Sequence, residues 1–211
     1  VAIALPGCAR ALKEAPAVAD LAGGGAPPAP SEVDGLLRQA EAAFARRTPE
    51  SANEATRLFL RAASGNAKRV EGLLGAVESQ VWLTDHESDP QARELAATLG
   101  VQAAQWCKRT APELPACDYW MGAALGVQAR ERPSTGASAL PQIEAAFKKA
   151  AEKEPALENG GPDRALALFY LRAPGWPAGP GDPALGLEHA RKAQPRSPDY
   201  PPNVMALAEA L

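Results

Sequence analysis

Few side chains in this sequence could carry out chemistry. The two histidines, His86 and His189, lie far apart in the chain. His86 belongs to the polar stretch TDHESD at 84–89, whose oxygen and imidazole groups are possible metal ligands; a solvated loop ended by Pro90 is the simpler interpretation. Neither histidine has a recognisable nucleophile as partner, and the motifs of zinc proteases, nucleotide-binding proteins and serine hydrolases are absent. We therefore expect no enzymatic activity, no metal and no cofactor.

The first of the three cysteines suggests a lipid anchor. The chain begins VAIALPGC, and an apolar stretch that ends in Leu-x-Gly-Cys is typical of the end of a bacterial lipoprotein signal peptide. Residues 1–8 are accordingly interpreted as the remnant of such a signal, with Cys8 as the lipidated residue. Residues 9–30 are rich in alanine, glycine and proline and are expected to form a disordered tether. The alternative is a short disordered N-terminus with an incidental cysteine.

The other two cysteines, Cys107 and Cys117, are predicted to form a disulfide. They flank a turn that contains Pro112 and Pro115, so the ends of two antiparallel helices would bring them together. Such a bond persists in an oxidising envelope compartment. Two buried free thiols are the competing interpretation, and a zinc site is disfavoured because two further ligands are missing.

Composition sets the class of element that must position these residues. Among the 211 residues, 47 are alanine and only 5% are aromatic, which favours closely packed helices over a β-sandwich or barrel. The net charge of −3 makes nucleic-acid binding improbable. No run of 18 apolar residues is present, so membrane contact is expected through the lipid alone. Apolar residues at helical spacing predict eight or nine helices joined by short loops.

The spacing of small and large residues indicates tetratricopeptide-like repeats. The first-helix pattern of that repeat, whose period is about 34 residues, matches W-x2-A-A-x2-V, which begins at Trp120. The second-helix pattern matches I-x3-F-x2-A-x4-P at 143–155 and G-x3-A-x2-A-x4-P at 186–198. We therefore predict an all-α fold in which residues 31–211 form antiparallel helix pairs stacked as a TPR-like α-solenoid. A generic alanine-rich helical bundle is the alternative.

One unit of this repeat is longer than the others. Pro155 and Pro198 are 43 residues apart, and the segment between them includes a Pro/Gly-rich loop at 172–182 that holds Trp176. The favoured interpretation is that Trp176 fills a gap in the core beneath this loop. The alternative is an exposed aromatic anchor for a partner, because tryptophan is enriched at binding hot spots.

The loop sequence and its surroundings resemble a known family. The run LFYLRAPGWP at 168–177 and the turn PDYP at 198–201 are similar to the T-component proteins of TRAP transporters (TatT-like) over about residues 33–211. The resemblance implies a lipoprotein of the periplasm or outer membrane that associates with a periplasmic substrate-binding protein and forms a possible trimer. It makes binding candidates of the following residues: Trp120, Tyr170, Pro174, Gly175 and Trp176. A structural scaffold that assembles an envelope or outer-membrane complex is the alternative function.

Overall fold

The computed structural model describes residues 14–66 and 68–211, and this part of the chain forms ten α-helices and no strand. The first four are α1 (Val18–Leu21), α2 (Val33–Phe44), α3 (Pro49–Gly65) and α4 (Glu71–His86). The next three are α5 (Pro90–Thr110), α6 (Pro115–Glu131) and α7 (Gly136–Lys153). The last three are α8 (Leu157–Arg172), α9 (Pro183–Ala193) and α10 (Pro201–Ala210). Short 3₁₀ turns lie at Pro30–Glu32, Pro133–Thr135 and Gln194–Arg196.

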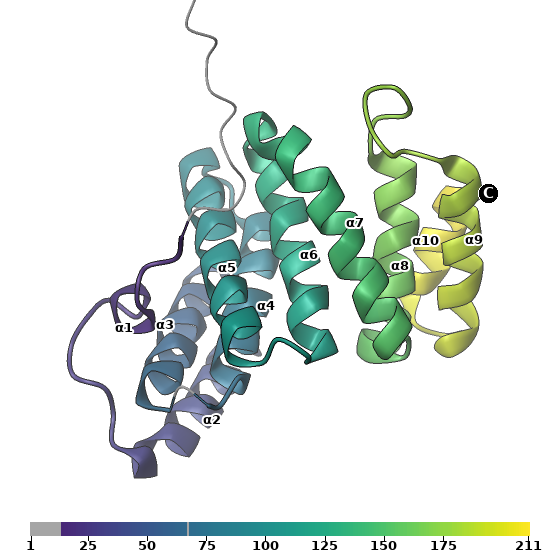
Figure 1. Ribbon diagram of the computed structural model, residues 1–211. Coiled ribbons are helices and arrows are strands. Elements are labelled where there is room, and N and C mark those ends of the chain that lie inside the picture. Colours follow the sequence, from purple (N-terminus) through teal and green to yellow (C-terminus); the bar gives the residue numbers. More distant parts are fainter. Residues whose placement is uncertain (1–13, 67) are drawn as a thin grey trace, which may run out of the picture.

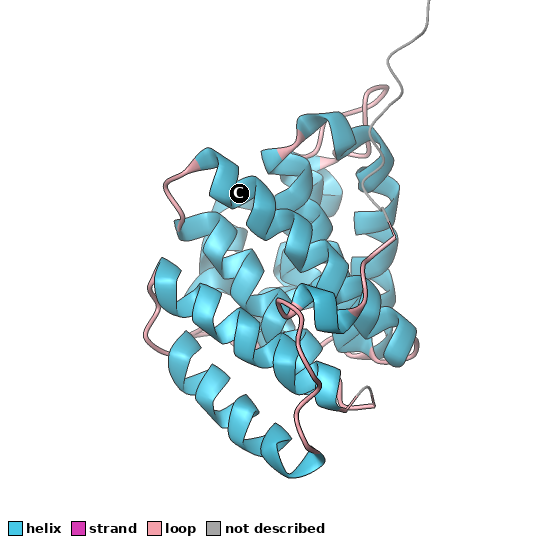
Figure 2. Ribbon diagram, turned by 90° about the vertical axis from the view of Figure 1, so that its left-hand side faces the viewer, coloured by secondary structure: helices cyan, strands magenta, loops and turns pink. Residues whose placement is uncertain are grey.

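From α2 onwards, the helices stack as antiparallel pairs in two layers (Figures 1 and 2). Each of α2, α4, α6 and α8 packs against the next even-numbered helix, whereas α3, α5, α7 and α9 form the other layer and pack mainly against their even-numbered neighbours. This arrangement confirms the predicted all-α class and the stacking of helix pairs. The stack is built from local contacts, as in repeat proteins, in which each unit buries its apolar face against the next.

Sequence signals explain where the helices begin. Five of the ten helices in the described part of the chain, α3, α5, α6, α9 and α10, begin at a proline. In α5 and α9 this proline follows an aspartate. The side chain of Asp89 accepts hydrogen bonds from the amides of Gln91 and Ala92, and Asp182 does the same for Ala184 and Leu185. Proline suits the first helical position because an N–H at that position has no acceptor within the helix, so nothing is lost when proline lacks one.

The tether prediction is wrong for residues 14–30, which are folded onto the helices. Helix α1 packs against α3 and α5, and the side chains of Ala15 and Pro28 are buried. The indole N–H of Trp106 donates a hydrogen bond to the carbonyl of Pro16 at 2.7 Å. The prolines lower the entropy lost on ordering, and Val18 and Leu21 add apolar contacts with the core, which together outweigh the cost of ordering this segment.

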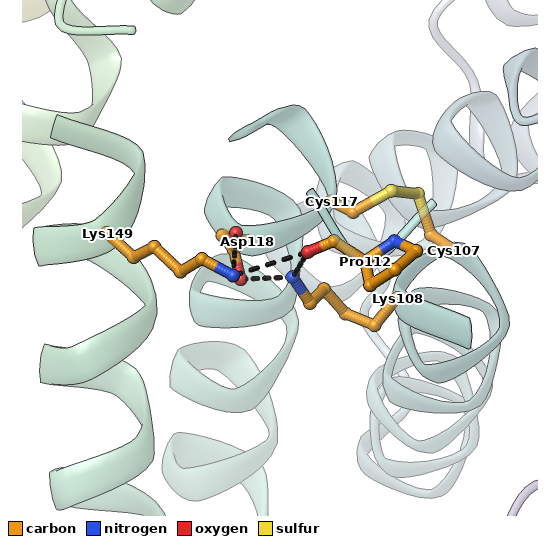
Figure 3. The surroundings of a disulfide bond; sticks show 6 residues. All are labelled: Cys107, Lys108, Pro112, Cys117, Asp118 and Lys149. Carbon is orange, nitrogen blue, oxygen red and sulfur yellow. Dashed lines mark hydrogen bonds and ion pairs between the residues drawn. A yellow bond between two sulfur atoms is a disulfide. The ribbon is translucent and has the colours of Figure 1, made fainter. Parts of the chain in front are cut away.

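Cys107 and Cys117 are joined by a disulfide between the end of α5 and the start of α6, with their Cα atoms 5.4 Å apart (Figure 3). Next to the bond, Asp118 is buried and lies between Lys108 and Lys149, whose ammonium nitrogens are 2.5 and 3.4 Å from its carboxylate oxygens. Both ammonium groups also donate to the carbonyl of Pro112, at 2.7 and 3.2 Å. The disulfide and this charge cluster together tie α5, α6 and α7 to one another at one end of these three helices.

Replacing both Cys107 and Cys117 by alanine is expected to lower the free energy of unfolding by about 2.5–3 kcal/mol, because the bond closes a loop of about ten residues in the unfolded chain. Urea denaturation of the oxidised protein and of the double variant measures the difference. A reducing agent should shift the midpoint of the wild type and leave that of the variant in place. Equal midpoints for the oxidised proteins would show that the bond does not stabilise this fold.

Candidate functional site

The loop between α8 and α9 projects beyond the ends of the helices it connects (Figure 1). Trp176 lies on this loop with 90% of its surface exposed, and Pro174 and Gly175 beside it are exposed as well. The prediction that Trp176 fills a gap in the core is therefore wrong. The loop directs the indole into solvent because its own backbone, and not a buried ring, holds its shape.

A set of backbone hydrogen bonds closes the loop on itself. The amide of Gly181 donates to the carbonyl of Pro174 at 2.8 Å, and the amides of Ala178 and Gly179 donate to the carbonyl of Gly175 at 3.0 and 3.1 Å. A Cβ at Gly181 would lie 2.2 Å from the carbonyl oxygen of Ala173, so only glycine permits this close approach. The loop is thus a braced ring of backbone that presents one large apolar side chain.

Tyr170 supports this loop from below and is not part of the surface. Its carbonyl accepts a hydrogen bond from the amide of Asp182 at 3.0 Å, and only 2% of the residue is exposed. Its hydroxyl donates to the carboxylate of Glu144 at 2.7 Å, and its ring stacks on that of His189 with 5.7 Å between the centroids. The structure therefore gives Tyr170 a positioning role at the base of the loop, in place of the direct contact with a partner that was expected.

A charged carboxylate on α7, that of Glu144, holds the hydroxyl of Tyr170 in place. Burial alone would raise the pKa of Glu144, but hydrogen bonds from Lys148 and Tyr170 outweigh burial and hold this pKa below its ordinary value. Lys148 lies 2.6 Å from the same carboxylate. Glu144 is therefore ionised at neutral pH and is a strong acceptor for the tyrosine hydroxyl.

The remaining predicted residues lie elsewhere. Trp120 is half-buried on α6, where it packs edge-to-face on Tyr119 with centroids 5.1 Å apart, and it belongs to an aromatic cluster separate from the loop. Cys8 lies outside the described residues. His86 occupies the last position of α4 and stacks on Trp82 at 3.9 Å, so it is part of a helix and not of the solvated loop expected at 84–89.

Sequence reasoning missed the pair formed by Asp163 and His189. Asp163 is buried on α8, and one of its carboxylate oxygens lies 2.9 Å from Nδ1 of His189 on α9. Asp163 shares a helical face with Leu166, Ala167 and Tyr170, a signal that this position is buried and needs a partner, but 26 positions in the sequence separate Asp163 from His189. Within residues 14–66 and 68–211, no group of three or more His, Cys, Asp or Glu side chains is arranged to hold a metal ion.

Together, the fold and the loop define an all-α helical-repeat protein with a preformed aromatic surface loop. None of the helices in the described part of the chain has the length and apolar character needed to cross a membrane. No protein-family model matches this chain, and no curated protein matches it significantly.

Replacing Trp176 by alanine is expected to leave the free energy of unfolding within about 0.5 kcal/mol of the wild type, because the exposed ring makes little contact with the core. Phe147→Ala is the matched control, since this ring is only 6% exposed and its removal is expected to cost about 3–5 kcal/mol. Thermal or urea melts of the two variants provide the comparison. A loss at Trp176 comparable with the loss at Phe147 would contradict the exposed position of the indole.

Proposed function

We propose that this protein is a non-catalytic, lipid-anchored helical-repeat protein of the bacterial envelope that docks a protein partner through the Trp176 loop. The single observation that carries the proposal is the exposure of Trp176 on a braced loop. Tryptophan is among the residues most enriched at binding hot spots, where its large ring fills a pocket on the partner. In the unbound protein, such an anchor residue is expected to be exposed to solvent, as Trp176 is.

The rigidity of the loop favours binding. Ordering a flexible loop on association costs free energy, and a loop already closed by its own hydrogen bonds avoids much of this cost. The segment from Ala173 to Gly181 contains no charged residue, so burying it against a partner leaves no ion without a counter-ion. Its chemistry therefore suits a largely apolar pocket on another protein.

The resemblance to the T-components of TRAP transporters suggests which partner this is. It rests on the LFYLRAPGWP run, which spans the end of α8 and the start of the loop, and on the PDYP turn, which leads into α10. A periplasmic substrate-binding protein is therefore the leading candidate partner, with the TPR-like stack as its platform. An envelope location is also supported by the disulfide between Cys107 and Cys117, because such bonds persist in oxidising compartments.

A scaffold that assembles an envelope or outer-membrane complex is the second candidate function. The observation in its favour is the exposed apolar face of α10, where Val204 is 48% and Met205 70% exposed. Such a face offers a second contact surface, separate from the loop, as a scaffold with several partners requires.

A photo-crosslinking amino acid at position 176, introduced in the native cells, is expected to capture a periplasmic substrate-binding protein, identified by mass spectrometry. The matched control is the same amino acid at Leu95, which is 72% exposed on α5, far from the loop in the chain. Capture of outer-membrane assembly proteins at position 176 would favour the scaffold function. Identical products at both positions, or none at position 176, would reject the docking role of the loop.

Replacing Cys8 by alanine is expected to move the protein from the membrane fraction to the soluble fraction, because the lipid attached to this cysteine is the proposed anchor. Immunoblots of the separated fractions measure the distribution, and Cys107→Ala is the control for the loss of a cysteine elsewhere. If the Cys8 variant stays with the membrane, the anchor proposal fails, whatever the outcome at the loop.

A further inference from the structure

A cavity of about 350 Å³ opens between α7 and α9, with α8 as its floor. Its size lies within the range of about 300–1,000 Å³ that is typical of small-molecule sites. The apolar part of the lining consists of Ala151, Pro155 and Leu166. Leu166 is fully buried beneath the cavity, so Ala151 and Pro155 provide the apolar surface that a ligand can contact. The cavity is distinct from the Trp176 loop, which contributes no lining residue.

The acidic group at the floor is already engaged. One carboxylate oxygen of Asp163 faces Nδ1 of His189 at 2.9 Å, and the other lies 3.7 Å from Nε of Arg196. Asp163 is 4% exposed, so its charge is compensated from within the protein and is poorly accessible to a cationic ligand. The floor therefore does not favour the binding of an amine.

Three of the four exposed charged side chains that line the cavity are cations, and each is paired with a carboxylate of the protein. Lys148, Lys192 and Arg196 line it, whereas Glu152 is the one exposed acidic side chain among the lining residues. The two lysines pair with glutamates one turn earlier on their own helices, Glu144 and Glu188, and both lysines are about half-exposed. Exposed pairs of this kind contribute little to stability, so an incoming anion can compete for the ammonium groups.

The arrangement thus combines accessible apolar side chains with cations at the mouth. We propose that this cavity binds a small organic carboxylate, whose anionic head pairs with Arg196 and Lys192 and whose aliphatic body lies against Ala151 and Pro155. A guanidinium group favours a carboxylate because it donates two hydrogen bonds in a planar geometry. The proposal does not depend on the docking role of the Trp176 loop.

The test is an isothermal titration of the full chain with sodium hexanoate, compared with hexylamine, hexanol and inorganic phosphate. Hexanoate is expected to bind at one site, and the Arg196→Gln variant is expected to weaken this binding about tenfold or more, since a charge-assisted hydrogen bond is lost. Arg191→Gln is the matched control, because Arg191 is exposed on α9 and does not line the cavity. Chemical-shift changes at the methyl group of Ala151 should locate the ligand.

A second variant keeps the test valid if Arg196→Gln disturbs the fold by weakening the pairing of Asp163. Lys192→Gln leaves the contact between Asp163 and His189 in place and is expected to weaken hexanoate binding several-fold. Equal binding of hexanol or hexylamine would overturn the proposal, as would binding of phosphate alone. The proposal would also be overturned if hexanoate did not bind, or if both variants bound it as the wild type does. Chemical-shift changes confined to other parts of the protein would overturn it as well.

Discussion

The close approach of neighbouring helices is the constraint on which the rest of this structure depends. A stack of helix pairs has no single central core, so each pair must bury its surface against the next. Here large side chains insert where the facing helix has glycine. A Cβ at Gly75 of α4 would lie 2.6 Å from the ring of Phe59 on α3, and a Cβ at Gly122 of α6 would lie 2.7 Å from that of Phe147 on α7.

The fully buried alanines serve the same purpose, because a methyl group lets two backbones come close while still excluding water. They occur in most helices of the two layers, for example Ala40, Ala55, Ala76, Ala104, Ala124, Ala150, Ala167 and Ala190, each with no exposed surface. The high alanine content of the chain is therefore a requirement of its architecture. Larger residues at these positions would push the helices apart and expose the rings that fill the grooves between them.

The stack is least uniform at its C-terminal unit. The chain enters α8 through Glu158, Asn159 and Gly160, whose φ angles of 49°, 59° and 82° are left-handed. The fully buried Asn203 of α10 secures this turn, because its side-chain amide faces the carbonyls of Asn159 and Ala193 at 2.8 and 3.1 Å. The contact between α7 and α8 is less extensive than that of the other consecutive pairs from α2 to α9, and the cavity lies at this junction.

The helices were largely predictable from the sequence, since apolar periodicity and proline positions are local signals. Pro141 is an exception: proline favours the first position of a helix, but α7 begins at Gly136 and includes Pro141 in its interior. Among the contacts that hold residues 14–30 is a hydrogen bond between Trp106 and Pro16, 90 positions apart, and composition contains no trace of such a pairing. The position of Trp176 was mistaken because a large apolar ring in a longer repeat suggested burial, whereas glycines and backbone hydrogen bonds give the loop its shape.

The loop and the cavity share one support, and this explains why both occur in the longest repeat. The carbonyl of Tyr170 holds the end of the loop at Asp182, while its ring packs on His189, which lines the cavity. Glu144 fixes the tyrosine hydroxyl from α7, on the other side of the cavity. Because a buried, hydrogen-bonded tyrosine cannot shift without losing several contacts at once, it holds loop and cavity wall in a fixed relation. The insertion that lengthens this repeat thus rests on a side chain of the regular stack, so a surface feature is added without loosening the helices beneath it.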